Sequence, residues 1–260
     1  MVFEKFDASY FDNVKHTFPE LGEVVTVENC IYYLSLLEQF TCLREQFQDC
    51  MDAFHARAEL RYQRWIEGCK HRSDLDDLNT AIIPPLDVAY IEHVHLVTPY
   101  RYTEDCQRMM PHMLSFNMPL KQLHLQRYIP DQQTISFWNN YCNIDGDDPF
   151  TLTINDLKGE VPGYRVCPFC NRCFKILGED FGKWRLSTFV YLKCWSCQKD
   201  FNIHDAAVDQ ICIDLKREKQ PKENDIPWIR YICMNYIFIK KRNLIQFFFQ
   251  KKNYFIFLII

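Results

Sequence analysis

The hydrophobic positions in the first half of the chain recur at steps of three and four. Residues 27–66 contain neither proline nor glycine, and their apolar side chains keep this spacing from Ile31 through Leu34, Leu37, Phe40, Leu43, Phe47, Met51 and Phe54 to Ala58. This period is typical of amphipathic helices. Because a span of about forty residues exceeds an ordinary globular helix, the pattern predicts one long bent helix or two helices that meet near residues 50–53.

Two further helices are predicted from their start signals. Pro84 and Pro85 suit a first turn, because proline lacks only an amide proton that this turn leaves unpaired. Asp87 is favoured at the positive end of the same helix, so we interpret it as a helix-start residue and not as a general base. Thr98 and Pro99 follow as the N-cap hydroxyl and first residue of the next helix.

A last helix of this part is expected over residues 131–142, so residues 1–145 are predicted to form an all-α domain. Residues 143–149 are acidic and turn-forming, which marks a boundary, and we assign residues 146–160 as a linker. The alternation of apolar and polar residues from Phe150 to Ile154 is typical of a strand.

Residues 161–220 are predicted to form a small β domain resembling a zinc ribbon, with a trailing helix from His204 to Arg217. Its β-compatible stretches include residues 188–192, and a long hairpin over residues 174–192 would absorb the spacer between its cysteine pairs. The expected fold class is therefore mainly α: an N-terminal helical domain, a small zinc-ribbon-like β domain and a C-terminal helix.

Residues 221–260 form an atypical tail that we expect to be poorly ordered. From residue 229 onward it consists mostly of Ile, Phe, Lys, Asn and Tyr, which AT-rich codons encode, so we hypothesise translated noncoding sequence. A spliced transcript that continues in frame through the tail would contradict this. A membrane anchor is not expected, because lysines interrupt the apolar runs well short of the ~20 residues that a span needs.

Composition narrows the class of protein and its compartment. The 260 residues are 48% hydrophobic and 15% aromatic, which indicates a globular chain, and the net charge of -4 shows no overall basic character. Thirteen cysteines, an odd number, and no apparent secretory leader indicate reduced thiols and a cytoplasmic or nuclear location. In such compartments C-x2-C pairs bind metal more often than they form disulfides.

Two C-x2-C pairs predict a structural zinc site. Cys167 and Cys170 form the first pair, and Cys194 and Cys197 form the second after a spacer of 23 residues. Two such turns supply four soft thiolates to one centre, which is the closed tetrahedral set of structural zinc.

The spare donors near these pairs leave the ligand set open. Cys173 extends the first pair to C-x2-C-x2-C, so it could replace Cys170 or remain outside the site. His204 could replace one thiolate in a Cys3His set.

His93 and His95 are the candidate catalytic residues of a metal-assisted hydrolase. Residues two apart on a helix point about 200° apart, so the pair cannot grip one metal without irregular backbone. We therefore prefer an arrangement in which one histidine is a hydrogen-bonded core residue and the other faces a neighbouring helix or solvent. No nucleophile elbow, phosphate-binding glycine loop or H-E-x-x-H motif occurs in the chain, so no enzyme is predicted.

Residues 84–106 resemble the signature segment of the glycine-rich domain-containing protein family of plants and fungi. The family pattern reads approximately P-P-L-D-V-E-W-V-W-H-C-H-x-L-N-P-x-x-Y-x-x-D-C. The segment falls in register with it, without a gap, at Pro84, Pro85, Leu86, Asp87, Val88, His93, His95, Pro99, Tyr102, Asp105 and Cys106. Similarity at Arg61, Tyr62, Trp65, Trp138 and Tyr141 extends the match over roughly residues 27–150. Two family tryptophans are replaced here by Tyr90 and Glu92, and the Gly-rich region is absent.

The resemblance implies an α-helical domain of uncharacterised activity, linked in plant members to stress and developmental regulation and proposed to involve RNA. It implies no enzyme, and the proposed RNA role belongs to parts that this chain lacks. The leading hypothesis is therefore a non-enzymatic interaction or scaffolding protein with protein partners.

RNA or DNA binding by the ribbon is the runner-up hypothesis. Residues 160–200 carry seven Lys and Arg against four Asp and Glu, with aromatic residues Phe169, Trp184 and Trp195 that could stack on bases. Membrane partners are not expected, and the pattern does not indicate an oligomeric state.

Overall fold

The computed structural model describes residues 25–75, 82–108, 110–114, 116–143, 146, 148–161 and 165–209. Over these residues the chain is mainly helical with a small amount of antiparallel sheet, which confirms the predicted class in this coarse form. The predictions for residues 1–24 and 210–260, which include the tail, lie outside the described residues. In the described part, no helix has both the length and the apolar character needed to cross a membrane.

The long helical pattern folds as two helices. α3 spans Val27–Gln46 and α4 spans Met51–Cys69, and a 3-10 turn, η1 (Gln48–Cys50), joins them. Neither proline nor glycine causes the break. Instead, the Phe47 ring at the junction is fully buried and stacks on Phe54 with 4.8 Å between ring centroids. Tertiary packing of these two rings therefore favours two helices over a single bent one.

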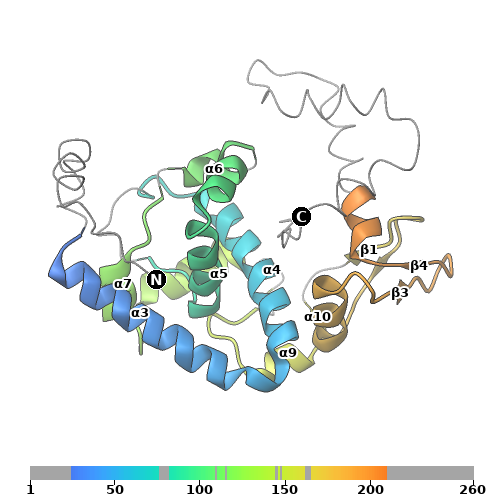
Figure 1. The fold of residues 1–260 in the computed structure, drawn as a ribbon, viewed down its shortest axis with the longest axis horizontal. Coiled ribbons are helices and arrows are strands. Elements are labelled where there is room, and N and C mark those ends of the chain that lie inside the picture. The colour runs from blue at the N-terminus through green and yellow to red at the C-terminus, as the bar shows by residue number, and fades with distance from the viewer. Residues whose placement is uncertain are drawn as a thin grey trace, which may run out of the picture.

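α4 is the central element of the molecule. It packs against α5 (Leu86–Leu96) and the π-helical turn η3 (Trp138–Cys142), and it also packs against α10 (Gly178–Leu186) (Figure 1). Its buried residues include apolar side chains such as Phe54 and also charged ones. Charged groups buried on such a helix must be paired, because an unpaired charge inside a protein is strongly unfavourable.

Both proline start signals are confirmed. Pro85 is the N-cap residue of α5, and Pro99 is the first residue of α6 (Pro99–Arg108). The Thr98 hydroxyl, which was expected to cap α6, donates to the carbonyl oxygen of His95 at 2.8 Å. It therefore also helps to close the end of α5.

The helix expected over residues 131–142 is confirmed, with a change of geometry inside it. α8 (Gln132–Phe137) begins where Asp131 accepts a hydrogen bond from the backbone N–H of Thr134 at 2.7 Å. The chain then continues as the π-helical η3. The short elements η2 (Pro111–Met113) and α7 (Leu120–Leu125) precede α8.

A buried ion network ties α4 to the segment that follows η3. Arg61 donates to Asp87 of α5 at 2.6 Å through Nε and to Asp148 through Nη1, and its guanidinium lies 4.4 Å from the Trp138 ring centre. Arg57 donates to Asp148 at 3.0 Å. Asp87 therefore lies in the first turn of α5, as predicted, and also pairs with a buried arginine.

The segment assigned as a linker carries core side chains. Leu152 and Leu157 are buried in the same cluster as the helical core, and Asp148 is buried in the ion network. The strand expected from Phe150 is wrong, because residues from Ile154 form α9 (Ile154–Lys158). Thr153 and Asp156 form a capping box, which is a helix signal that the short alternation concealed.

Two short hairpins follow. β1 (Arg165–Val166) pairs antiparallel with β2 (Cys173–Phe174), with Val166 opposite Cys173. β3 (Leu192–Lys193) pairs antiparallel with β4 (Asp200–Phe201), with Lys193 opposite Asp200.

The hairpin expected over residues 174–192 is wrong, because the middle of this spacer forms α10. Glu179 and Asp180 lie in its first turn, where acidic side chains favour a helix, and the buried Phe181 and Trp184 are three residues apart. These signals were present in the sequence.

α10 joins the hairpins to α4. A Cβ on Gly182 would lie 2.5 Å from the backbone nitrogen of Ala53, so only glycine permits this close approach. Arg185 donates to Glu59 of α4 at 2.9 Å through Nε. Ala56 of α4 belongs to the hydrophobic cluster beneath the hairpins. The cysteine-rich region is therefore packed directly on the central helix.

Candidate metal centre

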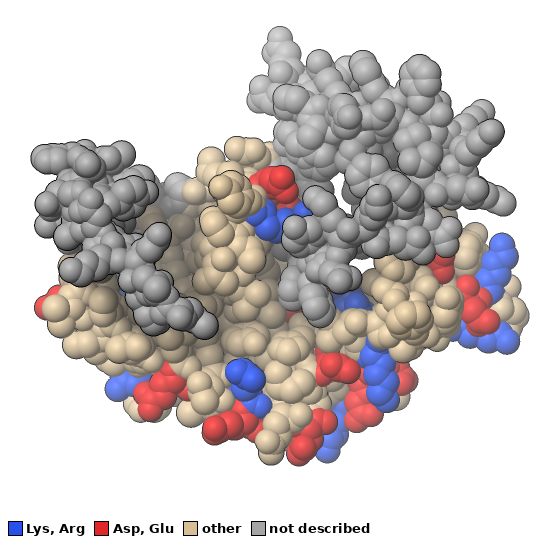
Figure 2. Space-filling model, in the orientation of Figure 1, with Lys and Arg blue, Asp and Glu red and all other residues tan. Residues whose placement is uncertain are grey.

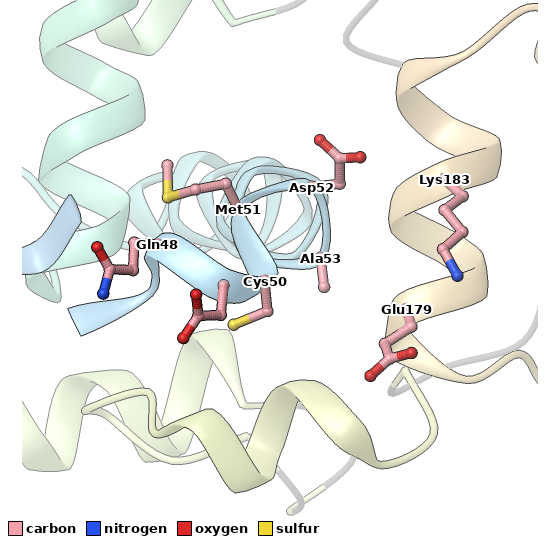
Figure 3. A pocket seen from close by; sticks show the side chains of 8 residues that line it. Gln48, Cys50, Met51, Asp52, Ala53, Glu179 and Lys183 are labelled. Atoms are coloured by element: carbon pink, nitrogen blue, oxygen red, sulfur yellow. The ribbon is translucent and has the colours of Figure 1, made fainter. Parts of the chain in front are cut away.

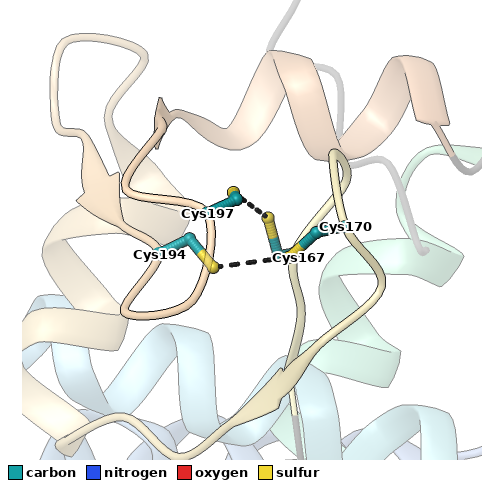
Figure 4. Close-up of side chains that lie close together, drawn as sticks. All are labelled: Cys167, Cys170, Cys194 and Cys197. Carbon is teal, nitrogen blue, oxygen red and sulfur yellow. Dashed lines mark hydrogen bonds between the residues drawn. The ribbon is translucent and has the colours of Figure 1, made fainter.

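The two cysteine pairs lie at the tips of the two hairpins. Cys167 follows β1 and Cys170 precedes β2, whereas Cys194 follows β3 and Cys197 precedes β4. The four side chains point toward one another across the gap between the two turns (Figure 4). The structure therefore brings together the four cysteines that the spacing predicted.

The sulfur atoms have the spacing of a tetrahedral metal site. Sγ of Cys167 lies 3.8 Å from Sγ of Cys197, and Sγ of Cys170 lies 3.6 Å from Sγ of Cys194 (Figure 4). All four ligand atoms lie within 4.8 Å of one another. A disulfide would need about 2.05 Å. Four thiolates at about 2.3 Å from zinc would lie about 3.8 Å apart, so the four sulfurs fit a zinc ion.

Both turns use the same backbone geometry. The residue after the second cysteine has a positive φ in each turn, 58° at Asn171 and 59° at Gln198. This conformation lets the N–H of Asn171 donate to the carbonyl of Cys167, and that of Gln198 to the carbonyl of Cys194, both at 2.9 Å. These two positions were not predicted from the sequence. The positive φ of Asn171 could have been predicted, because asparagine adopts the left-handed region more readily than most residues.

Backbone N–H groups stabilise the thiolate form of Cys194. Hydrogen bonds from the N–H groups of Cys197 and Ser196 lower the pKa of Cys194 to about 6. Burial raises the pKa of Cys167 to about 11. A bound cation would offset this burial penalty, because metal ligation deprotonates thiols.

Cys173 and His204 lie outside the cluster of four sulfurs. Cys173 lies on β2 opposite Val166 and is exposed. His204 is exposed in the helical stretch over residues 203–209, and its backbone N–H donates to Asn202. Among the described residues, the group close enough to share a metal contains neither of them.

His93 and His95 have separate partners, which agrees with the prediction that two residues this close on a helix do not hold one metal together. Nε2 of His93 lies 2.8 Å from the hydroxyl of Tyr33 on α3. Nδ1 of His95 lies 3.1 Å from the hydroxyl of Tyr62 on α4, and its Nε2 lies 3.4 Å from Asp105 on α6. The two rings therefore connect α5 to different helices and do not share one centre.

A buried carboxyl in the helical core was not singled out in the sequence as a titrating group. Glu92 of α5 is fully buried, and burial raises its pKa to about 8, against the opposing effects of Arg72 and Trp65. Glu92 is therefore largely protonated at neutral pH. A single sequence carries no signal for this, because burial of one face of α5 depends on the packing of α4.

A cleft of about 440 Å³ lies between the α3–α4 junction and α10 (Figure 3). Its lining comprises residues 48–53 together with Glu179 and Lys183. Burial, and then the charges of Asp49 and Glu179, raise the pKa of Cys50 above its usual value. The thiol stays protonated at neutral pH, so this cleft does not present a reactive thiolate.

Comparison of the chain with protein-family models, with curated proteins and with solved structures gave no match. The resemblance of residues 84–106 to the glycine-rich domain-containing family therefore stays a prediction.

Proposed function

We propose that the chain is a non-enzymatic interaction protein, in which a structural zinc ion holds a small zinc ribbon on a helical scaffold. The observation that carries this proposal is the placement of Cys167, Cys170, Cys194 and Cys197 at the sulfur spacings of a zinc tetrahedron. Cys173 and His204 are not needed as ligands in this proposal.

Zinc is proposed to supply most of the stability of the two hairpins. Each strand has only two residues, and an isolated hairpin of this kind is at best marginal in water. Structural zinc contributes roughly 10 to 16 kcal/mol in small zinc-binding peptides at neutral pH. That free energy would offset the conformational entropy lost when the two turns become ordered.

A non-enzymatic role is supported by the ligand set. Four protein thiolates complete the zinc coordination, so no position remains for water or substrate. The alternative of a metal-assisted hydrolase needs His93 and His95 at one centre, and their separate partners Tyr33, Tyr62 and Asp105 give it no support.

The scaffold role is supported by the way in which α4 connects the parts. One helix contacts α5 and η3 as well as α10, so a partner held by the ribbon is fixed relative to the helical region. We propose protein partners for the helical scaffold and nucleic acid as the candidate partner of the ribbon, because the ribbon exposes aromatic rings. The proposal requires a reducing compartment, because oxidised thiols cannot bind zinc.

Metal analysis of the full-length chain under reducing conditions tests the site. We expect one zinc per chain. Cys167→Ser and Cys194→Ser should abolish stoichiometric binding, because three thiolates leave the tetrahedron incomplete. Cys173→Ser is the matched control, since Cys173 is a neighbouring exposed thiol outside the cluster.

Zinc content well below one per chain in the unmodified protein would contradict the proposal. Zinc loss on Cys173→Ser would instead reassign the ligands. The interaction role is tested by affinity capture with the zinc-loaded chain and with Cys194→Ser. A set of captured molecules that is identical for both would show that the ribbon makes no contribution.

A further inference from the structure

We propose that the outer face of the ribbon binds single-stranded nucleic acid. We call this surface the knuckle face and define it by Phe169, Arg172, Lys193, Trp195 and Lys199. The inference rests on the proposed function, because zinc must hold the two cysteine turns side by side.

Each cysteine turn exposes an aromatic ring to solvent. Phe169 lies between Cys167 and Cys170 and is 47% exposed, and Trp195 lies between Cys194 and Cys197 and is 63% exposed. These rings are not needed for the small core, which Phe181, Trp184 and Phe201 fill. Exposed rings beside a backbone-binding surface are the groups on which unpaired bases stack.

Positive charge lies on the same two hairpins as these rings. Nζ of Lys199 lies 4.9 Å from the ring centre of Phe169, which places a cation of the second turn over the ring of the first. Arg172 and Lys193 are exposed on the same two hairpins. Within the described part of the chain, no acidic side chain forms an ion pair with these three cations, whereas Lys175 already pairs with Glu160 at 2.9 Å.

The hairpins of the ribbon carry a net positive charge, whereas α10 carries none. Residues 165–175 and 187–201 carry five Lys and Arg and one Asp, whereas α10 carries two basic and two acidic residues. α10 packs on α4, and Figure 1 shows β3 and β4 on the far side of α10 from α4. Lys and Arg side chains gather at this outer edge, with acidic atoms beside them (Figure 2). The basic hairpins are therefore left accessible.

This combination favours a single strand over a duplex or a protein. Stacking needs bases that are free of a partner, and the cations need a polyanion that runs past both turns. The same rings could contact an apolar protein surface, but such a partner would leave Arg172, Lys193 and Lys199 without anions. We therefore argue for nucleic acid.

Fluorescence anisotropy with the reduced, zinc-loaded full-length chain tests this proposal. The probe is a labelled single-stranded RNA of mixed sequence and about 12 nucleotides, within the range of known site sizes. DNA of the same sequence separates ribose recognition from stacking, and a duplex of that DNA tests the need for unpaired bases. Titrations at several salt concentrations should show a slope of log K against log salt near -2, about -0.7 for each of three phosphates.

Variants locate the binding to the knuckle face. Trp195→Ala should weaken binding at least about fivefold, since one lost base stack removes about 1 to 3 kcal/mol, and Trp195→Phe should retain most of the affinity. Lys199→Gln should reduce the salt slope by about 0.7. Tyr100→Ala, at a 90% exposed ring on α6, and Lys70→Gln at the end of α4 are the matched controls.

Zinc content is measured on every variant, so a loss of affinity with full zinc content reports on the face and not on folding. No binding of either single strand by the zinc-loaded chain would overturn the inference and leave the structural zinc proposal intact. Equal affinity of Trp195→Ala and the unmodified chain would also overturn it, as would a zinc-dependent protein partner that covers Trp195. A chain that binds no zinc at all would defeat the proposed function itself.

Discussion

The helical region and the cysteine-rich region reach stability by different means. The helical region buries a large apolar cluster around α4 and pairs its buried charges internally, as Arg61 does with Asp87 and Asp148. The cysteine-rich region has strands of two residues and a smaller cluster beneath them. A small core recovers less apolar burial per ordered residue, so such a region usually needs a metal or disulfides. The comparison teaches that two regions of one chain can differ in how far apolar burial alone can stabilise them.

Removal of zinc should produce the largest difference in stability between the two regions. We expect a strong chelator at neutral pH to destabilise the hairpins by several kcal/mol, because structural zinc contributes roughly 10 to 16 kcal/mol. Hydrogen exchange should then become fast for the amides of β1 to β4 and stay slow for those of α5. Equal loss of protection in both regions would show that the helical region also depends on the metal.

Arg61 offers the corresponding test of the helical region. Arg61→Met removes one partner from Asp87 and Asp148 and leaves buried carboxylates without full compensation, so the free energy of unfolding should fall by about 3 to 5 kcal/mol. Urea denaturation measures this loss. Lys70→Met removes an exposed pair with Glu67 and should change stability by less than about 1 kcal/mol. Similar small effects for both variants would contradict a structural role for the network.

The response to pH should also differ between the regions. The pKa of Glu92 is raised from 4.5 to about 8 in the folded state, so the folded chain keeps a proton that the unfolded chain releases between these values. Stability from this group is therefore complete below pH 4.5 and is lost as pH rises toward 8. The expected loss between pH 5 and pH 8 is about 3 kcal/mol.

Denaturation of Glu92→Gln at several pH values measures this effect, because the amide cannot ionise and should flatten the pH dependence. The zinc site should respond in the opposite direction, since acid protonates thiols and weakens zinc binding. An unchanged pH profile in Glu92→Gln would show that this carboxyl is not the titrating group.

The smallest expected effect concerns the contact that joins the regions. Gly182→Ala places a methyl group 2.5 Å from the backbone nitrogen of Ala53, so α10 must move from α4 at a cost of about 1 to 3 kcal/mol. Gly159→Ala is the matched control, because a Cβ there meets no atom within 4 Å. Thermal unfolding of the zinc-loaded variants compares them. Equal stability would mean that the helix contact adapts without strain.

Sequence reasoning succeeded where a local rule decides the outcome. Pro99 begins α6 because its ring suits a first turn, Pro85 lies immediately before the first residue of α5, and α8 begins directly after Asp131. It failed over residues 150–154 and 174–192, where short periodic patterns suggested strands. In such short windows a capping box or two spaced aromatic residues carries as much information as the alternation.

In the candidate site, too, some features could be predicted from local sequence and others could not. The two C-x2-C spacings were sufficient to predict Cys167, Cys170, Cys194 and Cys197, because each spacing closes a turn around one centre. The places of Cys173 and His204 outside the cluster could not be predicted, since they depend on the hairpin register and on the helix over residues 203–209. Helix geometry predicted that His93 and His95 do not hold one metal together, but it did not predict their partners on α3, α4 and α6.

By itself, the sequence determined the helical starts and the two C-x2-C pairs whose thiols cluster, because each depends on residues close together in the chain or on a fixed ligand spacing. Only the tertiary structure decided that Asp148 is buried against Arg61, that Glu92 holds its proton, and that Gly182 lets α10 touch α4. These features depend on groups far apart in sequence, whose burial and electrostatics exist only after the helices have packed together.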